Sequence, residues 1–276
     1  MTLTCNGQPA QVEDVLPALV NYGHFTSLQV RNHAVQGLDL HLARLSQATR
    51  ELFGSALDTA QVRGWMAQAL QQARQADASL RVTVYSRHFD FRNPLAAVPV
   101  DVLVAVSAPV TLTAAKRVRS VVWQRELPQI KHVGTFGLFA ERRAAMAEGF
   151  DDVLFVTADG DVSEGSTWNL AVHDGERLLW PQAPALRGTA ETLLKQHWPG
   201  AQLTQPLRLA GLAGLAGLAG VKAAFACNAS GLWALEAIDG HVLPGSQALA
   251  EQARAVLAAV PWDRFGSDPF CAAKGT

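Results

Sequence analysis

The sequence predicts an α/β protein with mixed sheets, organised in two domains. Short apolar or alternating runs, typical of strands, recur between longer runs in which apolar residues repeat at helical spacing. Apolar residues make up 49% of the 276-residue chain, which is ample for a sizeable core. Residues 107–117, which contain Pro109 and several Ala and Thr, indicate a linker. We therefore expect a smaller domain at 1–107, a linker at 108–120 and a larger domain at 121–276.

The first domain is expected to combine four strands with two helices. The strands are predicted at 2–5, 22–31, 80–85 and 100–106. One helix is predicted to begin at Asp39, and a second is predicted over 59–76. An Asn6-Gly7 pair after the first strand favours a tight hairpin turn. Pro17 interrupts the apolar run 15–20, so we expect a loop there. The second helix has Thr59 in the capping position, and its buried stripe is predicted to be Val62, Met66, Ala69 and Leu70.

The second domain is expected to be richer in strands. They are predicted at 118–124, 150–157, 170–173, 177–180 and 223–231, with a final hairpin over 237–242. Helices are predicted over 139–149, after Gly188 and over 247–259. Residues 209–220 repeat the triplet Leu-Ala-Gly. Because glycine weakens a helix by roughly 1 kcal/mol relative to alanine, we expect a short helix or loop without chemistry there. The tail from 264 to 276 is expected to be loose.

The composition excludes several classes of protein. Charged residues are sparse and balanced, with a formal net charge of −1, so neither a nucleic-acid partner nor an acidic arm is expected. The three cysteines are too few and too widely spaced for a disulfide framework or a metal site. The N-terminal stretch does not have the pattern of a signal peptide, and no apolar run approaches the roughly 20 residues of a membrane span. We expect a cytoplasmic protein with no membrane partner.

The stretch from Lys131 to Asn169 has the pattern of a cofactor site. Lys131 stands at its head, and Glu164 lies among small residues near its end. Such a pair suits pyridoxal phosphate (PLP), because a lysine amine can condense with the cofactor aldehyde. A carboxylate at the pyridine nitrogen keeps that nitrogen protonated, so the ring can accept electrons.

This stretch resembles the class IV, or fold type IV, PLP enzymes: branched-chain aminotransferases, D-amino-acid aminotransferases and aminodeoxychorismate lyases. The resemblance rests on Ile130-Lys131-His132 and on residues 159–169, where Val-x-Glu-Gly-x-x-x-Asn is the specific part, and it covers nearly the whole chain. It implies a two-domain fold like that of D-amino-acid aminotransferase. It also implies a cofactor in the cleft between the domains and a homodimer that completes the site.

The resemblance implies a role for each of four residues. Lys131 would hold the cofactor, Glu164 would lie at the pyridine nitrogen, and Asn169 would lie near the cofactor hydroxyl. Arg44, in a His-x-x-Arg-Leu motif that starts at His41, would bind the phosphate, which suits the planar fork of arginine. Taken singly, the four are better explained as a surface lysine, a strand-end charge, a turn former and an exposed helix arginine; the ordered set of motifs is what favours the PLP site. His41 is expected to be a packed or capping histidine.

A helix that starts after Gly188 is the expected phosphate-binding loop, since the free amides of a helix N-terminus bind anions. The resemblance assigns Gly188, Thr189 and Ala190 to the phosphate. The family pattern is Leu-x-Gly-Ile-Thr-Arg, however, and here Thr189, Ala190 and Glu191 take the last three places. Glu191 would repel a phosphate unless it points outward. The alternative is a plain turn from loop to helix.

Three residues are candidates for substrate binding. Thr26 lies in the place of a Gly-x-Phe-Thr-Thr strand of the family. Arg92, in the polar loop 88–94, could meet a substrate carboxylate. Asn228 belongs to a Cys-Asn-Ala sequence like one in aminodeoxychorismate lyases. Each has a plainer alternative, which is a solvent-facing threonine, a surface loop and a turn-forming asparagine respectively.

The resemblance implies a PLP-dependent aminotransferase that moves an amino group between an amino acid and a 2-keto acid. An aminodeoxychorismate-type lyase that releases pyruvate is the first alternative. Thr26 and Asn228 favour the lyase, as does Phe136, which stands where branched-chain enzymes have a tyrosine. A non-catalytic binding protein of the same fold is the second alternative, supported only by the altered residues 188–191. The sequence does not fix the substrate or the preference for L or D amino acids.

Overall fold

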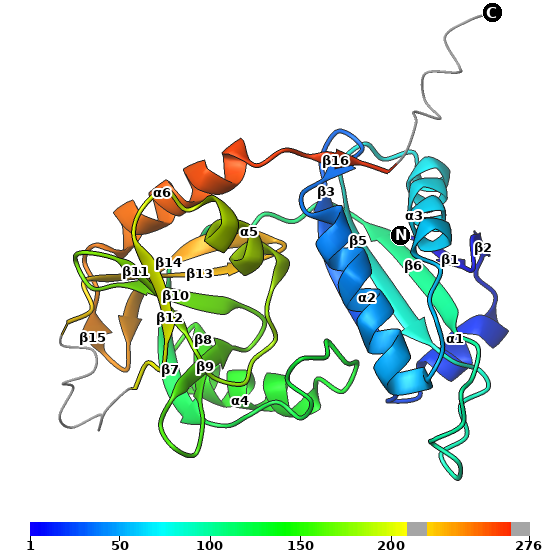
Figure 1. Cartoon of the computed structure of the whole chain (residues 1–276), viewed down its shortest axis with the longest axis horizontal. Helices are drawn as coiled ribbons and strands as arrows, with labels where there is room; N and C mark the ends of the chain where they lie inside the picture. The colour runs from blue at the N-terminus through cyan, green and yellow to red at the C-terminus, as the bar shows by residue number, and fades with distance from the viewer. Residues whose placement is uncertain (209–219, 266–276) are drawn as a thin grey trace, which may run out of the picture. The chain divides into compact units, whose positions relative to one another are not determined.

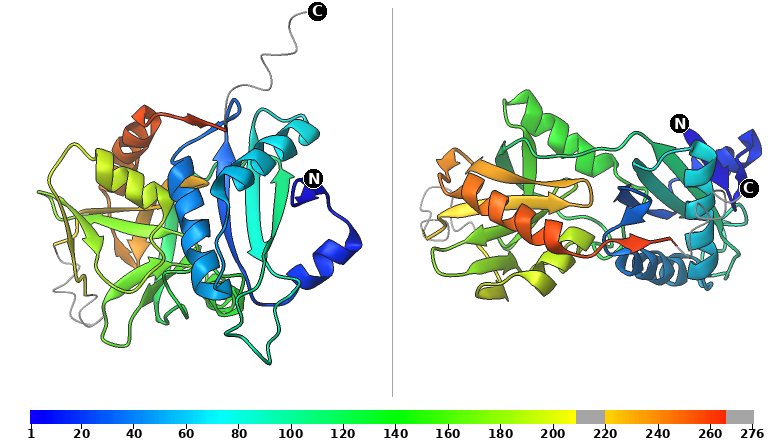
Figure 2. Two further views of the ribbon diagram at one scale, coloured as in Figure 1. Left: turned by 45° about the vertical axis from the view of Figure 1, so that its right-hand side comes forward. Right: turned by 90° about the horizontal axis from the view of Figure 1, so that it is seen from above.

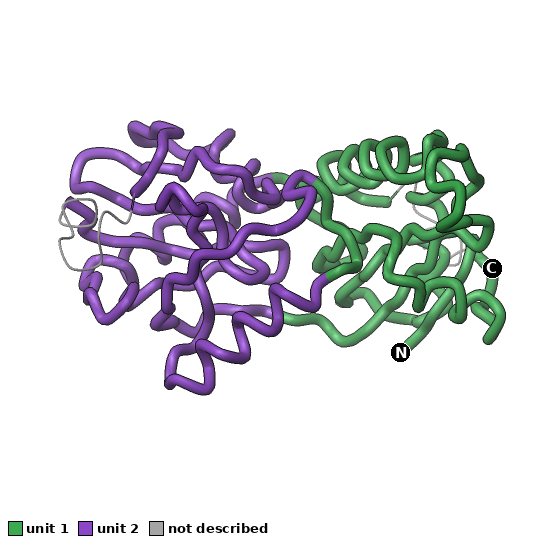
Figure 3. Tube along the Cα trace, turned by 90° about the horizontal axis from the view of Figure 1, so that it is seen from below, with its two compact units in different colours: residues 1–110, 130–134, 261–276 green, residues 111–129, 135–260 purple. Residues whose placement is uncertain are grey.

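The computed structural model describes residues 1–208 and 220–265, so the repeat at 209–219 and the tail at 266–276 lie outside the described residues. The chain forms two compact units (Figure 3). Unit 1 contains Met1–Val110, Ile130–Gly134 and the described residues from Pro261 onward. Unit 2 contains Thr111–Gln129 and Thr135–Val260. The expected division at a linker over 108–120 is close to the first of these boundaries, although strand β7 already starts at Lys116.

Unit 1 is an antiparallel sheet with two long helices on one face and a short helix against the other (Figures 1 and 2). Its strands, in the order β2-β1-β6-β5-β3, are β1 (Thr2–Cys5), β2 (Gln8–Pro9), β3 (His24–Val30), β5 (Ala78–Tyr85) and β6 (Asp101–Ser107). The helices are α1 (Val12–Ala18), α2 (Leu38–Phe53) and α3 (Thr59–Ala73), and a short ribbon pairs β4 (Ala34–Val35) with β16 (Asp263–Arg264). Alternate strand residues such as Leu28 and Val82 pack against Leu45 of α2 and Met66 of α3. This alternation is what a sheet covered on one face requires.

Two local predictions for unit 1 differ from the structure. The first part of the expected loop at 15–20 belongs to α1, which begins at a capping box between Gln11 and Asp14 and includes Pro17 one residue before its end. The cap of α3 is Asp58, whose carboxylate accepts from the amide of Gln61, and not Thr59. The predicted hairpin at Asn6-Gly7 and the buried stripe of α3 are confirmed.

Unit 2 contains a mixed sheet in the order β12-β11-β10-β13-β14-β7-β8-β9, with β15 paired to β14 (Figure 1). The strands are β7 (Lys116–Val122), β8 (Asp152–Val156), β9 (Val162–Gly165), β10 (Asn169–His173), β11 (Leu178–Pro181), β12 (Gln202–Gln205), β13 (Ala223–Asn228), β14 (Gly231–Ile238) and β15 (His241–Val242). The helices are α4 (Phe136–Ala147), α5 (Thr189–His197) and α6 (Ser246–Ala259). Trp168 and Trp233 pack in one core, and α5 and α6 cover a second core around Phe225. Strand β12, which was not predicted from the sequence, pairs in parallel with β11.

The segment Ile130–Gly134 leaves unit 2 and adds to the edge of the unit 1 sheet. The carbonyl of Lys131 accepts from the amide of Phe25 at 2.8 Å, and the amide of Val133 donates to the carbonyl of Gly23 at 2.9 Å. His24 and His132 form an antiparallel bridge between these two bonds. Lys131 therefore lies in unit 1, whereas the sequence analysis placed it in the larger C-terminal domain. The reason is that the open edge of β3 offers backbone partners to a segment distant in sequence.

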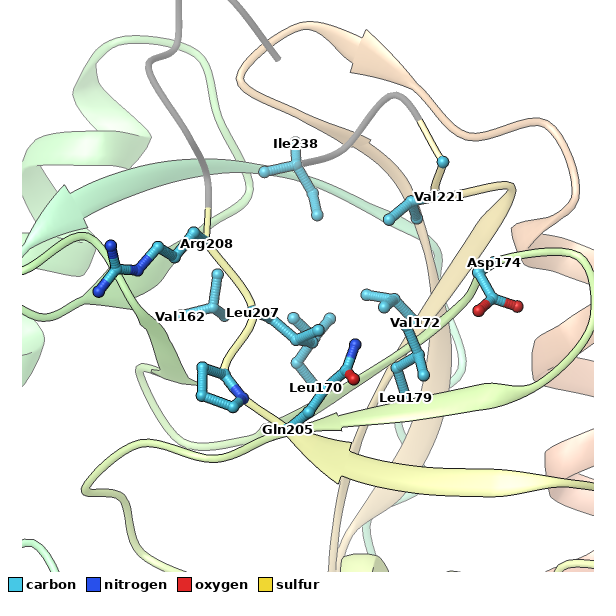
Figure 4. Close-up of a pocket in the computed structure, with 12 residues that line it drawn as sticks. Val162, Leu170, Val172, Asp174, Leu179, Gln205, Leu207, Arg208, Val221 and Ile238 are labelled. Atoms are coloured by element: carbon cyan, nitrogen blue, oxygen red, sulfur yellow. The ribbon is translucent and has the colours of Figure 1, made fainter. Parts of the chain in front are cut away.

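Unit 2 also holds an apolar pocket of about 370 Å³ (Figure 4). Its wall is formed mainly by side chains of one sheet face, including Leu170, Val172, Leu179 and Ile238, with Leu207 beside them. The candidate site residues are not among the described residues that line it. The pocket is bounded by Arg208 and Gly220, between which the chain passes through residues outside the described part.

Candidate active site

Lys131 lies near an aromatic ring of unit 1, and a second cationic side chain lies near the same ring. Its Nζ is 4.9 Å from the centre of the Phe25 ring, and the guanidinium carbon of Arg81 is 3.5 Å from the same centre. Both distances are in the range of cation–π contacts. Arg81 projects from the exposed face of β5 and makes no ion pair with any described carboxylate. Arg81 was not selected from the sequence, because its stacking on Phe25 depends on strand register.

Arg44 projects from α2 and carries a charge that the described residues do not compensate. Its Nη2 donates to the hydroxyl of Thr26 at 2.5 Å and lies 3.3 Å from Nδ1 of His41. Its Nε is fully buried and has no hydrogen-bond partner among the described residues. Within residues 1–208 and 220–265, no carboxylate forms an ion pair with it. Burial lowers the pKa of Arg44 to about 10, so the group remains a cation near neutral pH.

A buried cation without a counter-charge is costly, and an anion that reaches it gains strong charge-assisted hydrogen bonds. The position predicted to bind the cofactor phosphate therefore has the properties of an anion site. Two buried histidines lie close by: His24, which is bonded to Thr49 at 3.0 Å, and His41. Burial, followed by the charge of Arg44, lowers the pKa of His24 to about 3 and that of His41 well below its usual value. Neither histidine adds positive charge at neutral pH.

Thr26 lies in the interior of unit 1. Its side chain is fully buried, and its hydroxyl is 2.7 Å from Nδ1 of His41 and accepts from Arg44. The solvent-facing alternative for this residue is therefore wrong, and its role toward a substrate stays a prediction. Strand alternation places Thr26 on the same face of β3 as Leu28 and Val30, and that face is covered by α2.

Glu164 of β9 forms a buried ion pair in unit 2. Its Oε1 accepts from Nε of Arg125 at 3.1 Å, and the two side chains are only 4% and 3% exposed. A carboxylate buried without such a partner would be strongly destabilising, so Arg125 supports the position of Glu164. Arg125 was not selected from the sequence, although a lone carboxylate in the strand Val162–Gly165 indicates a cation from elsewhere in the chain.

Asn169 fastens the loop that leads into α5. Its Nδ2 donates to the carbonyl of Leu186 at 2.7 Å, and its Oδ1 accepts from the amide of Gly188 at 3.1 Å. A β-carbon at position 188 would lie 2.3 Å from Oδ1, so only glycine allows this approach. The two residues selected from the sequence are thus brought together. The expected contact between Asn169 and the cofactor hydroxyl stays a prediction.

Gly188 is the N-cap of α5, and Thr189 and Ala190 begin the helix. The first amides of a helix have no intrahelical partner, so those of Thr189 and Ala190 can bind an anion. Glu191 points inward rather than outward and is 1% exposed. Its Oε1 contacts Lys195 at 2.6 Å and Arg187 at 3.2 Å, while Oε2 is buried without a hydrogen bond to any described residue. These two cations compensate the charge that was expected to repel a phosphate.

The other two substrate candidates have different environments. Arg92 is exposed in the loop after β5 and lies over the neighbouring Phe91 ring at 4.7 Å. Asn228 donates to the carbonyl of Thr167 and accepts from the amide of Ser230, so it shapes the turn between β13 and β14. The turn-forming alternative therefore describes Asn228.

Comparison of the sequence with known families identifies the group to which the chain belongs. The signature described as amino-transferase class IV matches residues 23–237, which include Arg44, Lys131 and Glu164. The chain belongs to the class IV aminotransferase family. It is therefore an enzyme of the PLP-dependent transferases, as the resemblance implied. No curated protein gave a significant match to the whole sequence.

Solved structures agree with the fold of this family. The chain is similar to a hypothetical aminotransferase from Mycobacterium tuberculosis in its PLP-bound form, with 21% identity, 94% of this chain and 99% of that chain covered, and a TM-score of 0.74. It is similar to a branched-chain aminotransferase from Thermoproteus uzoniensis with norvaline, with 19% identity, 94% of each chain covered, and a TM-score of 0.79. It is also similar to a putative 4-amino-4-deoxychorismate lyase from Legionella pneumophila, with 18% identity, 88% and 93% covered, and a TM-score of 0.75.

These likenesses confirm the predicted fold class, a two-domain fold type IV structure with α/β units. No described helix is long and apolar enough to cross a membrane. No cluster of three or more potential metal ligands occurs in residues 1–208 and 220–265.

Proposed function

We propose that this protein uses PLP to transfer an amino group between an amino acid and a 2-keto acid, with Lys131 as the catalytic residue. The observation that carries the proposal is the guanidinium of Arg44, uncompensated within the described residues, in the same unit as Lys131. A phosphate group would supply the missing negative charge. Further support comes from the similar Mycobacterium tuberculosis protein, which is known in a PLP-bound form and in a form with alpha-ketoglutarate and PMP bound.

We propose that each functional group of PLP is held by residues of matching chemistry. Arg44, together with the amides of Thr189 and Ala190 after Gly188, would hold the phosphate. Glu164, with Arg125 behind it, would hold the pyridine nitrogen, and Asn169 keeps the loop into α5 in place. When bound, PLP supplies a ring that accepts electrons from the substrate.

Lys131 would act as the proton carrier of the reaction. Its amine would take a proton from the substrate Cα and would later return that proton to the reacting molecule, so it would serve first as a base and then as an acid. Glu164 would keep the proton on the pyridine nitrogen, because a carboxylate favours a neighbouring positive charge. The ion pair with Arg125 keeps the buried side chain of Glu164 in place for this role.

We propose Arg81 rather than Arg92 as the partner of the substrate carboxylate. Support comes from its position over the ring of Phe25, which also lies under the amine of Lys131. A carboxylate bound by the fork of Arg81 would therefore be close to the amine that moves the proton. Arg92 instead lies over Phe91 in an exposed loop.

We also propose a homodimer that works in the cytoplasm. The helix α4 exposes Phe136, Phe139 and Met146, which fall on one face at helical spacing and would be covered by a second copy. Cys5 and Cys227 are free buried thiols, which suits a reducing compartment. Light scattering on the purified protein tests the dimer: a monomer at micromolar concentration would contradict it.

The decisive experiment combines covalent trapping with kinetics. The protein is incubated with PLP, reduced with borohydride and digested, and we expect the phosphopyridoxyl group on the peptide that contains Lys131. Lys131→Ala should lose the adduct, the absorbance of bound PLP and amino transfer. Lys222→Ala, a lysine remote from the motif, is the matched control and should keep all three. Full turnover by Lys131→Ala would refute the mechanism, and absence of an adduct on the wild-type protein would favour the non-catalytic alternative.

The lyase is the second candidate. Of the three residues that favoured it, Thr26 and Asn228 are engaged by the protein itself, which leaves Phe136 and the similarity to the putative lyase. The two activities are separated by their products. Release of pyruvate from aminodeoxychorismate without a keto-acid acceptor indicates the lyase, and amino transfer that requires a 2-keto acid indicates the aminotransferase.

A further inference from the structure

We propose that Thr26 and His41 are positioning residues that hold the guanidinium of Arg44 in the orientation that binds the cofactor phosphate. The inference rests on the function proposed above. The three side chains come from two elements, since Thr26 lies on β3 while His41 and Arg44 lie one turn apart on α2. Their polar atoms lie within 2.5 to 3.3 Å of one another in the interior of unit 1.

The hydrogen bonds among these residues can run in one direction only. Arginine has donors and no acceptor, so Arg44 must donate to the Thr26 oxygen. The hydroxyl has a single proton, which then points to the nearest remaining acceptor, Nδ1 of His41 at 2.7 Å. His41 must therefore be neutral and carry its proton on Nε2.

A protonated His41 would break this arrangement. Its Nδ1–H would point at the Thr26 oxygen, so the threonine would face two donors and its own proton would have no acceptor. Two cations would also lie 3.3 Å apart. Burial together with the charges of Arg44 and Lys131 keeps the pKa of His41 well below its usual value, so the neutral form prevails near neutral pH.

The chain of hydrogen bonds from Arg44 through Thr26 to His41, called the relay below, gives Arg44 a fixed orientation before any ligand binds. Nη2 is held by Thr26, and Nε is left as a buried donor without an acceptor among the described residues. A guanidinium that is already oriented loses less freedom when it binds an anion. The relay should therefore act on the phosphate contribution to affinity and leave the rest of the cofactor unaffected.

The test compares PLP with pyridoxal, which has no phosphate, by spectral titration of the full chain after removal of bound cofactor. Thr26→Val keeps the shape of the side chain and removes the hydroxyl, and we expect PLP to bind about tenfold more weakly while pyridoxal binding stays within about twofold. Thr26→Ser restores the hydroxyl and should restore PLP affinity. A general structural defect would weaken both ligands.

A second pair of variants tests the other end of the relay. His41→Asn retains an oxygen acceptor near the place of Nδ1 and should keep the preference for PLP, whereas His41→Leu should lose it. If Thr26→Val and His41→Leu bind PLP as well as the wild type, or lose pyridoxal to the same extent, the proposal is overturned. If the wild type itself does not prefer PLP over pyridoxal, the role of Arg44 in the proposed function fails instead.

Discussion

Two arginines, one in each unit, have opposite surroundings. Arg125 meets Glu164 in an ion pair whose two side chains are almost fully buried. Arg44 contacts a hydroxyl and a neutral imidazole, and its Nε has no partner in the part of the chain that the structure describes. Both groups are charged; Arg125 is buried, and Arg44 is partly buried with a fully buried Nε, so what distinguishes them most is the presence or absence of a counter-charge.

The difference shows how a fold can prepare a cation for two purposes. A compensated arginine stabilises the carboxylate beside it and is part of the folded structure. An uncompensated arginine costs stability, and a ligand that supplies the missing charge recovers that cost. The comparison therefore predicts that the loss of Arg125 damages folding, whereas the loss of Arg44 damages binding.

The largest effect is expected for Arg125→Met. It leaves the carboxylate of Glu164 buried without its cation, which typically destabilises a protein by about 3–5 kcal/mol. Denaturant unfolding measures this loss. Arg208→Met, which removes an exposed ion pair with Asp161, is the matched control and should change stability by less than about 1 kcal/mol. The double variant Arg125→Met, Glu164→Gln should recover much of the loss, and no recovery would mean that charge compensation is not the cause.

Arg44→Met should have the opposite profile. We expect PLP to bind about 10- to 100-fold more weakly, since charge-assisted hydrogen bonds to the phosphate are lost. The unfolding free energy of the PLP-free protein should stay unchanged or rise, because a buried charge without a counter-charge has been removed. Arg50→Met, on the exposed side of the same helix, serves as control. A fall in PLP-free stability as large as that of Arg125→Met would erase the distinction between the two arginines.

The histidines beside Arg44 should make this region sensitive to acid. The pKa of His24 is lowered to about 3, mainly by burial, while an unfolded histidine titrates near pH 6.5. The unfolded chain therefore binds the proton more readily, and stability falls as the pH drops from about 6.5 toward 3. From pH 8 to pH 5 this one group should remove on the order of 2 kcal/mol. His24→Gln should flatten the pH dependence of the unfolding midpoint, and an unchanged slope would contradict this assignment.

Arg81 offers the smallest and most specific effect, since it is exposed and forms no ion pair with the described carboxylates. Arg81→Ala should raise the KM for amino acid and keto acid about tenfold, with little change in PLP affinity or stability. Arg92→Ala is the paired control and should leave KM within about twofold. A larger increase of KM in Arg92→Ala than in Arg81→Ala would mean that Arg92, the residue selected from the sequence, binds the substrate carboxylate.

Much of the fold could be predicted because local patterns were strong. The period of the apolar residues located α2, α3 and most strands, and the Asn6-Gly7 pair located the first hairpin. The helix α1 was missed because a proline was taken to end an apolar run, although a capping box precedes it. Strand β12 was missed because its own sequence is polar and does not indicate a strand. Its conformation depends on pairing with β11 in the folded protein.

The candidate site was predicted less evenly, for a physical reason. Motif spacing selected Lys131, Arg44 and Glu164, but a motif does not say which way a side chain points. Thr26 was taken as substrate-facing, and its orientation toward α2 could be learned only from how the sheet is covered. Arg125 and Arg81 were missed because each is defined by a partner, Glu164 or Phe25, that the sequence does not bring next to it.

The segment that carries Lys131 also bears on how this protein can be divided. The polypeptide passes from one unit to the other after Val110, Gln129, Gly134 and Val260. A fragment that ends at Val110 would lack the five residues Ile130–Gly134 and would leave the backbone groups of Gly23 and Phe25, at the start of β3, without their partners. Such a fragment should therefore be less stable than the same unit in the whole chain, and recombination between relatives should work best where the exchanged piece carries all of these crossings together.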